Sequence, residues 1–493
     1  MDDRVRALPV PAAPWDFAEI SSAARAGSKT VSESIVRRLV AVVDGAAVLA
    51  TGALSMEWSM SMTDWRRLAL VILLGTVLGI NLLHLAGAYR FDSFRHFESA
   101  VGRVLVGWLA AFFALIALTG FIEPITVEGR PWMAAWFLTG LVSLVAIRLT
   151  LLTQIHRWSR QGRLGQTVAV VGAGPIAQRL LRSLHASNPS YVRIIGVYDD
   201  DATRLPGHCM GHAIRGTVDD LVRDTRRIGI GIILVALPLH RDRLLVETLN
   251  RLSLVPVDVR LCLDEFGMRL GAVQSSHLGG LTFLNVIDRP LRDWKQIAKA
   301  IEDRSLATLI LALISPLLLA VAILIKLDSP GPVFFRQKRY GFNNQLIEVL
   351  KFRTMHHAAA DANAEQLTRR NDPRITRLGT FLRRSSFDEL PQFLNVLRGE
   401  MSIVGPRPHA LKAKAGTLLY AEAVKYYDAR HRVKPGITGW AQINGWRGET
   451  DTIEQIRKRV EYDLYYIEHW SIFLDLKIIA RTIFGGFRGQ HAF

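Results

Sequence analysis

Long apolar stretches separated by short polar segments dominate the first third of the chain. Four of them, residues 39–56, 68–88, 104–122 and 132–152, approach the roughly 20 apolar residues that a helix needs to cross a bilayer. Buried core helices are the alternative, but four successive stretches of this length favour membrane spans. Asp44 and Arg148 interrupt the pattern, and we expect Arg148 to reach the interface with its long side chain.

Basic residues around these stretches predict their orientation. Arg37 and Arg38 precede the first stretch, whereas the loop between the third and fourth carries Arg130 as its one basic residue. Because short basic loops stay in the cytoplasm, both ends of the four-helix bundle are expected there. Arg66 and Arg67, in the first external loop, run against this assignment.

A fifth apolar stretch, residues 306–325, lies far from the others and carries Ser315 and Pro316 at its middle. Basic residues flank it on both sides, among them Lys299 and Lys326. A spanning helix would place one of these flanks outside. Because proline removes a backbone hydrogen bond and bends a helix, we expect a re-entrant membrane helix over 305–326. This helix would break at Ser315 and Pro316 and leave by the face that it entered.

Between the membrane stretches lies a soluble α/β pattern. Residues 167–171, 192–197, 232–237 and 255–261 read as buried strands that alternate with helices, which is typical of a doubly wound, Rossmann-like domain. Gly172, Gly174 and Ala177 form a G-x-G-x-x-A turn between the first strand and its helix, and Asp199 follows the second strand.

Two functions are open for this middle domain. The glycine turn and Asp199 could bind the phosphate and ribose of a nucleotide, or the domain could be a regulatory or scaffolding module. The chain contains no Tyr-x-x-x-Lys pair, which argues against a short-chain dehydrogenase or a nucleotide-sugar epimerase.

The last third begins with a predicted hairpin, residues 333–336 and 347–352, and continues to adjacent carboxylates at Asp388 and Glu389. Ser386 and Glu389 could form a helix capping box, but Pro391 fits better if the helix begins at Asp388. Adjacent acids beside arginines can bind Mg²⁺ or supply a nucleophile, while the arginines hold phosphate. The spacing leaves both the structural and the catalytic interpretation open.

Overall composition agrees with a membrane protein whose partners are anionic. Lys and Arg exceed Asp and Glu by 61 − 44 = 17, hydrophobic residues make up 49% and the mean hydropathy is +0.19. These values exclude a disordered chain and argue against an ordinary soluble enzyme. Anionic lipid and phosphorylated substrates therefore account for the basic excess, with no nucleic acid required. The two cysteines, Cys209 and Cys262, are expected to be free thiols.

Several long motifs in order carry a family resemblance. They are SPLLLA (315–320), DSPGPVFFRQKRYG (328–341), KFRTM (351–355), RRSSFDELPQFLNVLRGEMSIVGPRP (383–408) and KPGITGWAQINGW (434–446). This text resembles the bacterial polyprenyl-phosphate sugar-1-phosphate transferases, also called monotopic phosphoglycosyl transferases. Four spans followed by a CoA-binding-like Rossmann domain match the large subclass. Glu400 stands where many relatives have aspartate.

The resemblance implies transfer of a sugar 1-phosphate from a UDP-sugar, with UDP-glucose the best candidate, to undecaprenyl phosphate. UMP leaves, and a covalent phosphosugar–aspartyl intermediate forms. The product starts a repeat unit of an exopolysaccharide, capsule or O-antigen. Competing interpretations are a Rossmann-based membrane oxidoreductase of nucleotide sugars and a non-catalytic polysaccharide-assembly protein.

Residue roles follow from the same resemblance. Asp388 would be the nucleophile, and Glu389 would help to position Mg²⁺ or handle a proton. Both carboxylates are candidate Mg²⁺ ligands. The candidate phosphate-binding residues are cationic or can become so, and they are Arg383, Arg407, Lys351, Arg353, His431, Arg432 and Lys434.

The predicted organisation has four parts: a cytoplasmic tail (1–38), a four-helix transmembrane bundle (39–155), a Rossmann-like domain (164–290) and an α+β catalytic domain (300–493). We expect a multi-pass protein of the bacterial inner membrane, with its catalytic domain on the cytoplasmic face. The expected partners are a UDP-sugar, undecaprenyl phosphate and membrane lipids, and a homodimer is compatible with this layout.

Overall fold

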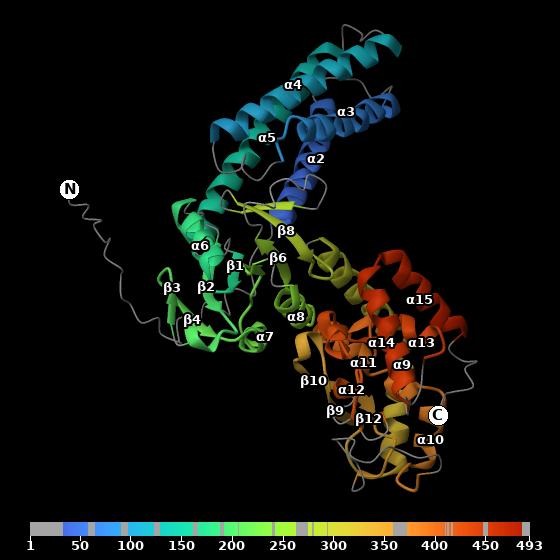
Figure 1. Ribbon diagram of the computed structural model, residues 1–493. Coiled ribbons are helices and arrows are strands. Elements are labelled where there is room, and N and C mark those ends of the chain that lie inside the picture. Colours follow the sequence, from blue (N-terminus) through green and yellow to red (C-terminus); the bar gives the residue numbers. More distant parts are fainter. Residues whose placement is uncertain are drawn as a thin grey trace, which may run out of the picture. The chain divides into compact units, whose positions relative to one another are not determined.

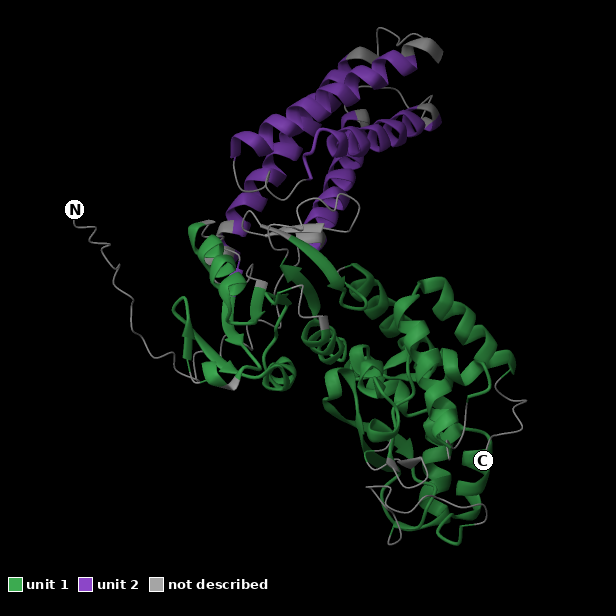
Figure 2. Cartoon of the chain, in the orientation of Figure 1, with its two compact units in different colours: residues 1–24, 167–189, 194–493 green, residues 25–166, 190–193 purple. Residues whose placement is uncertain are grey.

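The computed structural model describes most of the chain (Figure 1). The described residues are 33–57, 65–89, 97–122, 129–160, 166–187, 192–205, 207–238, 242–262, 275–278, 281–292, 294–357, 372–409, 411, 414–415, 418–446 and 452–485. Most of the predicted tail, 1–38, lies outside them. The chain divides into two compact units (Figure 2), one holding residues 25–166 and 190–193, the other including 167–189 and 194–493.

The first unit is a four-helix bundle. Its helices are α2 (Glu33–Glu57), α3 (Trp65–Leu85), α4 (Phe97–Ile122) and α5 (Gly129–Arg160). All four are long and apolar enough to cross a membrane, as is α9 (Trp294–Asp328) of the other unit. Aliphatic side chains and tryptophans pack in the interior, and glycines such as Gly75 and Gly140 let the indole rings of Trp136 and Trp108 approach closely. The indole N–H of Trp136, for example, donates to the carbonyl of Val48 at 3.0 Å.

A buried ion pair crosses the interior of this bundle. Arg148 donates to the two carboxylate oxygens of Asp44 at 3.0 and 2.7 Å, and both side chains are fully buried. The prediction that Arg148 reaches the interface is therefore wrong. A charge buried in an apolar bundle needs a partner, and Asp44 lies within reach on the neighbouring helix α2.

The second unit begins with the doubly wound domain. Its eight-stranded sheet has the order β3-β4-β2-β1-β5-β6-β8-β7. The strands are β1 (Gln166–Val171), β2 (Val192–Tyr198), β3 (Gly207–Cys209), β4 (His212–Gly216), β5 (Ile232–Val235), β6 (Asp258–Cys262), β7 (Ser275–Leu278) and β8 (Leu281–Ile287). The helices are α6 (Pro175–Ser187), α7 (Val218–Arg227) and α8 (Asp242–Leu252), with a 3₁₀ turn η3 (Ala202–Arg204).

The four strands predicted from buried apolar runs are present as β1, β2, β5 and β6, and β1, β5 and β6 pair in parallel. Sequence analysis missed the four others. Short edge strands such as β3 and β7 lack a continuous apolar run because one face or edge is solvated. Both cysteines are buried thiols of this domain.

The transferase part of the unit follows. Its larger elements after α9 are β9 (Phe334–Tyr340), β10 (Leu346–Phe352), α10 (Arg377–Arg384), α11 (Gln392–Arg398), β11 (Ser402–Val404), β14 (Gly436–Thr438), α14 (Ile453–Glu468) and α15 (Ile472–Gly485). Shorter ones are η5 (Phe342–Asn344), η7 (Phe387–Glu389), β12 (Lys414–Ala415), β13 (Leu418–Leu419), α12 (Tyr420–Ala423), η8 (Tyr427–Arg432) and α13 (Trp440–Ile443). The predicted hairpin is confirmed as the antiparallel pair β9–β10.

Helix α9 is anchored by a buried polar network at its first turns. Lys299 contacts Asp303 at 3.0 Å and Asp475 of α15 at 2.6 Å. Asp303 also accepts hydrogen bonds from the hydroxyl of Ser402 and the amide of Ile403, at 2.9 and 3.0 Å. The network therefore joins α9 to α15 and β11, and β11 leads directly to Arg407.

The helix continues through Pro316 without interruption for 35 residues, and Ser315 donates to the carbonyl of Ala312 at 2.9 Å. The helix therefore does not break at Ser315 and Pro316, contrary to the prediction. Proline costs one hydrogen bond and bends a helix, but its φ angle remains helical.

Candidate active site

The carboxylate pair lies on a single 3₁₀ turn, η7, between two helices. Ser386 precedes the turn with a left-handed backbone (φ 58°) and makes no side-chain capping hydrogen bond, and Pro391 is the N-cap of α11. The capping-box interpretation is therefore wrong. Helix α11 begins at Gln392, later than the predicted start at Asp388, because Phe387–Glu389 forms its own tight turn.

Cations from two other elements reach Glu389. The guanidinium of Arg407 makes a bidentate contact, with distances of 3.0 and 2.5 Å to the two carboxylate oxygens. Lys351, on β10, donates to Oε1 at 2.8 Å. Burial alone would raise the pKa of Glu389, but Arg407 and Lys351 hold it well below its usual range. Glu389 is therefore an ionised, fully engaged carboxylate.

Asp388 has a different environment. It is 9% exposed, and its one ion-pair contact among the described residues is with Lys351, at 4.0 Å. Burial raises the pKa of Asp388 above its ordinary value, and the neighbouring Glu389 charge adds to this, against the attraction of Lys351 and Arg383. The pair thus divides into one carboxylate that two cations contact directly and one whose nearest recorded cation lies 4.0 Å away.

Two predicted arginines lie around this centre. Arg407 follows β11 and belongs to the cluster directly. Arg383, in the last turn of α10, donates from Nε to the hydroxyl of Thr354 at 2.9 Å, and its charge acts on Asp388. Burial lowers the pKa of Arg383, and Asp388 opposes this change. Lys351, Arg383 and Arg407 are therefore brought together with the carboxylates, and their phosphate-binding role stays a prediction.

Arg353 has a structural role instead of the predicted phosphate contact. It is buried, and its guanidinium donates to the carbonyls of Pro330 and Ser329, both at 2.6 Å, and to that of Ile325 at 3.3 Å. These carbonyls end helix α9 and begin the turn after it. Both Nη atoms of Arg353 thus hold the end of a helix, while its Nε is buried without a hydrogen-bond partner.

The three candidates of the 431–434 segment also make other contacts. His431 is buried beside the rings of Tyr340 and Tyr427, and burial lowers its pKa to about 3. It is therefore neutral and no phosphate-binding cation. Arg432 donates to the carbonyl of Asp288 at 2.8 Å. Burial lowers the pKa of Lys434, which interacts with the charge of Asp303. Within the described residues, none of the three has a recorded contact with the carboxylate pair.

Sequence analysis missed the residues that hold this cluster in place. Asn395 of α11 is fully buried; its amide oxygen accepts from the backbone of Leu350 at 3.0 Å and its amide nitrogen donates to Glu400 at 2.6 Å. It ties the helix after Asp388 to the strand of Lys351. In the sequence, a single asparagine within an apolar helical pattern could have indicated this buried role.

A second missed group supports Arg407 from behind. Arg430 pairs with Asp463 at 2.7 Å, with both side chains almost fully buried, and donates to the carbonyl of Arg407 at 2.7 Å. Arg339 donates to the carbonyl of Pro408, and burial together with the repulsion of Arg407 lowers the pKa of Arg339 to about 10. These contacts fix two successive backbone carbonyls, those of Arg407 and Pro408, directly after the Arg407 side chain.

The glycine turn of the doubly wound domain binds a carboxylate of its own chain. Asp199 accepts from the amide of Ala173 at 2.7 Å and from Arg204 at 2.8 Å, and its second oxygen accepts from the amide of Asp201 at 3.0 Å. Gly172 has φ +98° and packs against the carbonyl of Ala236, while Ala177 is fully buried. Asp199 thus takes one amide of the glycine turn, that of Ala173, which favours the scaffolding interpretation.

Comparison with known proteins adds independent findings. Residues 294–489 match the bacterial sugar transferase family model, and residues 84–262 match a CoA-binding domain model. The UDP-glucose:undecaprenyl-phosphate glucose-1-phosphate transferase of Escherichia coli (strain K12) is 39% identical over 79% of this chain and 82% of its own length. The protein of the same name from Xanthomonas campestris pv. campestris is 38% identical over 77% and 78%.

A shorter match has a different sugar in its name. The UDP-N-acetylgalactosamine-undecaprenyl-phosphate N-acetylgalactosaminephosphotransferase of Aeromonas hydrophila is 42% identical over 36% of this chain and 40% of its own length. The long matches, over 390 and 385 residues, extend well beyond the 196 residues of the transferase family model. This chain therefore belongs to the bacterial sugar transferases, as a polyprenyl-phosphate sugar-1-phosphate transferase.

Proposed function

We propose that the protein transfers glucose 1-phosphate from UDP-glucose to undecaprenyl phosphate and releases UMP. The names of the relatives that match most of the chain support this pair of substrates. The observation that carries the proposal is the division of the carboxylate pair. Arg407 and Lys351 engage both oxygens of Glu389, whereas Asp388 has a cation at 4.0 Å and stays open to attack a phosphorus.

The reaction that this division supports has two displacements. In the first, a carboxylate oxygen of Asp388 bonds to the β-phosphorus of UDP-glucose, and the phosphoanhydride bond breaks so that UMP leaves with its electron pair. In the second, a phosphate oxygen of undecaprenyl phosphate bonds to the same phosphorus and the acyl phosphate bond breaks. Asp388 regains its charge, so the cycle needs no net proton transfer.

The cations around Asp388 stabilise the charge of the transferred phosphoryl group. A transferring phosphoryl group spreads negative charge over its oxygens, and fixed cations in a dry site stabilise that charge. Arg407 and Lys351 are held by Glu389, so their charges are in place before a substrate arrives. Arg383 lies on the other side of Asp388 in the chain and has Nη donors available for a phosphate, besides its Nε contact to Thr354.

Mg²⁺ is the expected cofactor, and the donor set fits it in kind. Mg²⁺ takes oxygen ligands, usually one or two carboxylates with substrate phosphates and waters, and Asp388 and Glu389 are the two carboxylates that would hold it. When bound, the ion would neutralise charge on the diphosphate. Because Lys351 and Arg407 engage the oxygens of Glu389, Glu389 would have to share them with the metal.

For the membrane arrangement, we propose four spans, α2–α5, and a re-entrant α9 with the transferase domain on the cytoplasmic face of the inner membrane. Two core clusters support the re-entrant path. Ala307, near the first half of α9, packs with Val349 and Val396, while Val321 and Ile325, in its second half, pack with Phe352 and Leu382. Both ends of the apolar segment thus contact one water-facing domain.

The test of the reaction is UMP release by detergent-purified protein with undecaprenyl phosphate, Mg²⁺ and UDP-glucose, UDP-galactose or UDP-N-acetylgalactosamine. We expect release with UDP-glucose, and a loss of about 10³-fold or more in Asp388→Asn. Glu348→Gln is the matched control, because Glu348 is an exposed carboxylate on β10. Without the lipid, radiolabel from UDP-glucose should stay on the wild-type protein and not on Asp388→Asn. Full turnover in Asp388→Asn would refute the assigned nucleophile.

A further inference from the structure

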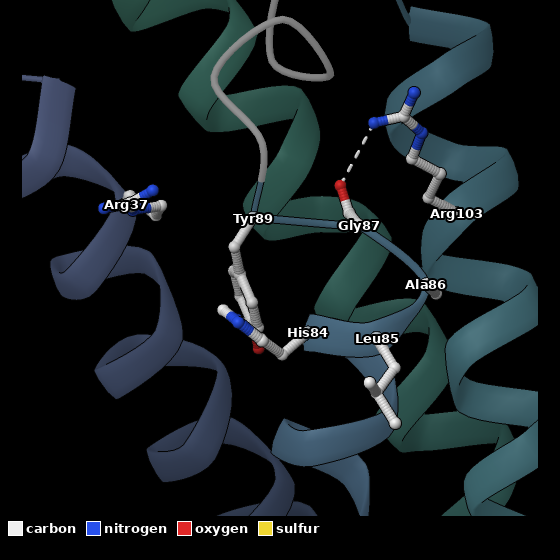
Figure 3. A pocket seen from close by; sticks show the side chains of 7 residues that line it. All are labelled: Arg37, His84, Leu85, Ala86, Gly87, Tyr89 and Arg103. Carbon is white, nitrogen blue, oxygen red and sulfur yellow. Dashed lines mark hydrogen bonds between the residues drawn. The ribbon is translucent and has the colours of Figure 1, made fainter. Parts of the chain in front are cut away.

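Arg383 is fixed through a different atom from two arginines that hold backbone carbonyls. In the four-helix unit, Arg103 donates from Nη1 to the carbonyl of Gly87 at 3.2 Å (Figure 3). Arg353 likewise donates from both Nη atoms to carbonyls at the end of α9. Arg383 instead donates from Nε to the hydroxyl of Thr354 at 2.9 Å. Within the described part of the chain, Arg383 has no recorded Nη hydrogen bond, so this contact orients the planar group and leaves two of its nitrogens for a ligand.

Thr354 meets helix α10 at three places. At the start of the helix, the amide of the N-cap residue Thr376 donates to the carbonyl of Thr354 at 3.0 Å. Three residues later, a Cβ built on Gly379 would overlap that carbonyl oxygen and lie 2.8 Å from the carbonyl carbon. In the last turn, Arg383 contacts the hydroxyl. Glycine at position 379 therefore lets the helix backbone approach Thr354 closely, and Arg383 reaches the hydroxyl from this position.

The short segment 351–354 serves both carboxylates of the pair. Lys351 donates to Glu389 at 2.8 Å. Three residues later, Thr354 contacts Arg383, whose positive charge opposes the rise in the pKa of Asp388. Thr354 is 7% exposed, and no contact between its hydroxyl and Asp388 is recorded among the described residues. Its influence on the carboxylate pair therefore runs through Arg383.

We propose that Thr354 is a positioning residue whose hydroxyl fixes the guanidinium of Arg383, so that the Nη atoms face a phosphate of the sugar nucleotide. An arginine side chain that is already restrained loses less rotamer freedom when it binds a phosphate, which strengthens binding. The contact also keeps the charge of Arg383 near Asp388, the proposed nucleophile. This inference rests on the proposed function, because it takes Arg383 to contact the diphosphate of the donor substrate.

A purely structural role for the Thr354 hydroxyl makes a different prediction. Thr376 and Gly379 meet the carbonyl of Thr354, whereas Arg383 contacts the hydroxyl. Thr354→Val removes the hydroxyl but keeps the branched shape and the carbonyl, and Thr354→Ser keeps the hydroxyl. If the hydroxyl acts through Arg383, its removal has no further effect once the arginine is absent. If it only stabilises α10, its removal has the same effect with or without Arg383.

The experiment is isothermal titration calorimetry of the full-length protein in detergent with inorganic pyrophosphate and Mg²⁺, and UMP release from UDP-glucose is measured on the same samples. We expect Thr354→Val to weaken pyrophosphate binding about tenfold, the loss typical of one hydrogen bond to a charged group. Thr354→Ser should bind as the wild type does. Arg383→Ala, alone or combined with Thr354→Val, should give one and the same weakened affinity. The matched control is Thr380→Val on the same helix, because the Thr380 hydroxyl donates to the carbonyl of Thr376 at 3.2 Å; this variant should bind as the wild type does.

Each outcome decides the role of Thr354. A loss in Thr354→Val that is absent in Thr354→Ser, and that disappears in the Arg383→Ala background, supports the positioning role. Unchanged binding in Thr354→Val, an equal loss in Thr380→Val or a further loss in the double variant overturns it, as does a wild-type protein that does not bind pyrophosphate. The expected binding pattern without UMP release refutes the proposed reaction but supports the positioning role. Melting curves verify that each variant is folded, and Thr354→Ala replaces Thr354→Val if the valine variant is not.

Discussion

Glu389 and Asp388 are adjacent in sequence but differ in their ionisation. Arg407 and Lys351 stabilise the charge of Glu389, whereas burial raises the pKa of Asp388 above its ordinary value. The proposed attack needs the charged form of Asp388. Turnover should therefore fall as the pH drops through this raised pKa, at a higher pH than an exposed aspartate would give.

Replacing Glu389 tests this coupling. In Glu389→Gln the neighbouring negative charge is absent, and Lys351 and Arg407 lose their carboxylate partner, so both act more strongly on Asp388. The pKa of Asp388 should fall and the acid limb of the kcat profile should move to lower pH, together with a lower kcat. The measurement is UMP release between pH 4 and 8, with Glu348→Gln as the control whose acid limb stays in place. A limb that moves to higher pH would contradict the assignment.

Among the elements, helix α9 is the most informative about how the chain enters the membrane. It is continuous through Pro316, yet residues in both of its halves pack with the transferase domain. A helix that crossed the bilayer would carry its second half away from that domain. The contacts therefore favour the re-entrant path on packing grounds, in agreement with the basic residues on both flanks.

Single cysteines at the two flanks test this path. Lys295 and Lys326 are exposed at either end of the apolar segment, whereas the natural Cys209 and Cys262 are buried. We expect Lys295→Cys and Lys326→Cys both to react with a membrane-impermeant maleimide in inside-out vesicles and neither to react in intact spheroplasts. Labelling after permeabilisation is the control for reactivity. Reaction of Lys326→Cys in spheroplasts would show a spanning helix.

At the scale of the whole molecule, ion pairs differ widely in how much they contribute to the free energy of unfolding. The doubly wound domain meets the transferase domain at Arg226 and Asp428, 3.5 Å apart and about one third exposed. The pair Arg430 and Asp463, inside the transferase domain, is almost fully buried. Partly exposed pairs contribute about 0–1 kcal/mol, whereas removing one partner of a buried pair costs about 3–5 kcal/mol.

These two pairs offer a matched comparison. Asp428→Asn should shift the melting temperature little and leave UMP release close to that of the wild type. Asp463→Asn leaves the buried guanidinium of Arg430 without its charge partner, so we expect a large drop in melting temperature. Because Arg430 also holds the carbonyl of Arg407, the apparent KM for the UDP-sugar should rise in any protein that remains folded. Equal effects in the two variants would contradict this ranking.

The sequence by itself determined the features that depend on local pattern: the long apolar helices, the buried parallel strands, the hairpin, and the motifs that carry Asp388, Glu389, Arg383, Arg407 and Lys351. The length of an apolar run and the residue types of a turn can be read from the sequence alone, because both depend on neighbouring residues. Family membership, too, followed from the order of the motifs.

Tertiary structure decided which polar side chains share a partner. It paired Arg148 with Asp44, turned Arg353 to the end of α9, turned Asp199 to its own glycine loop and buried His431 in a neutral state. The sequence shows that these residues are polar, but each partner depends on which distant segment packs alongside. A buried charge must find a partner within a few ångströms, and only the folded chain brings the partners that close.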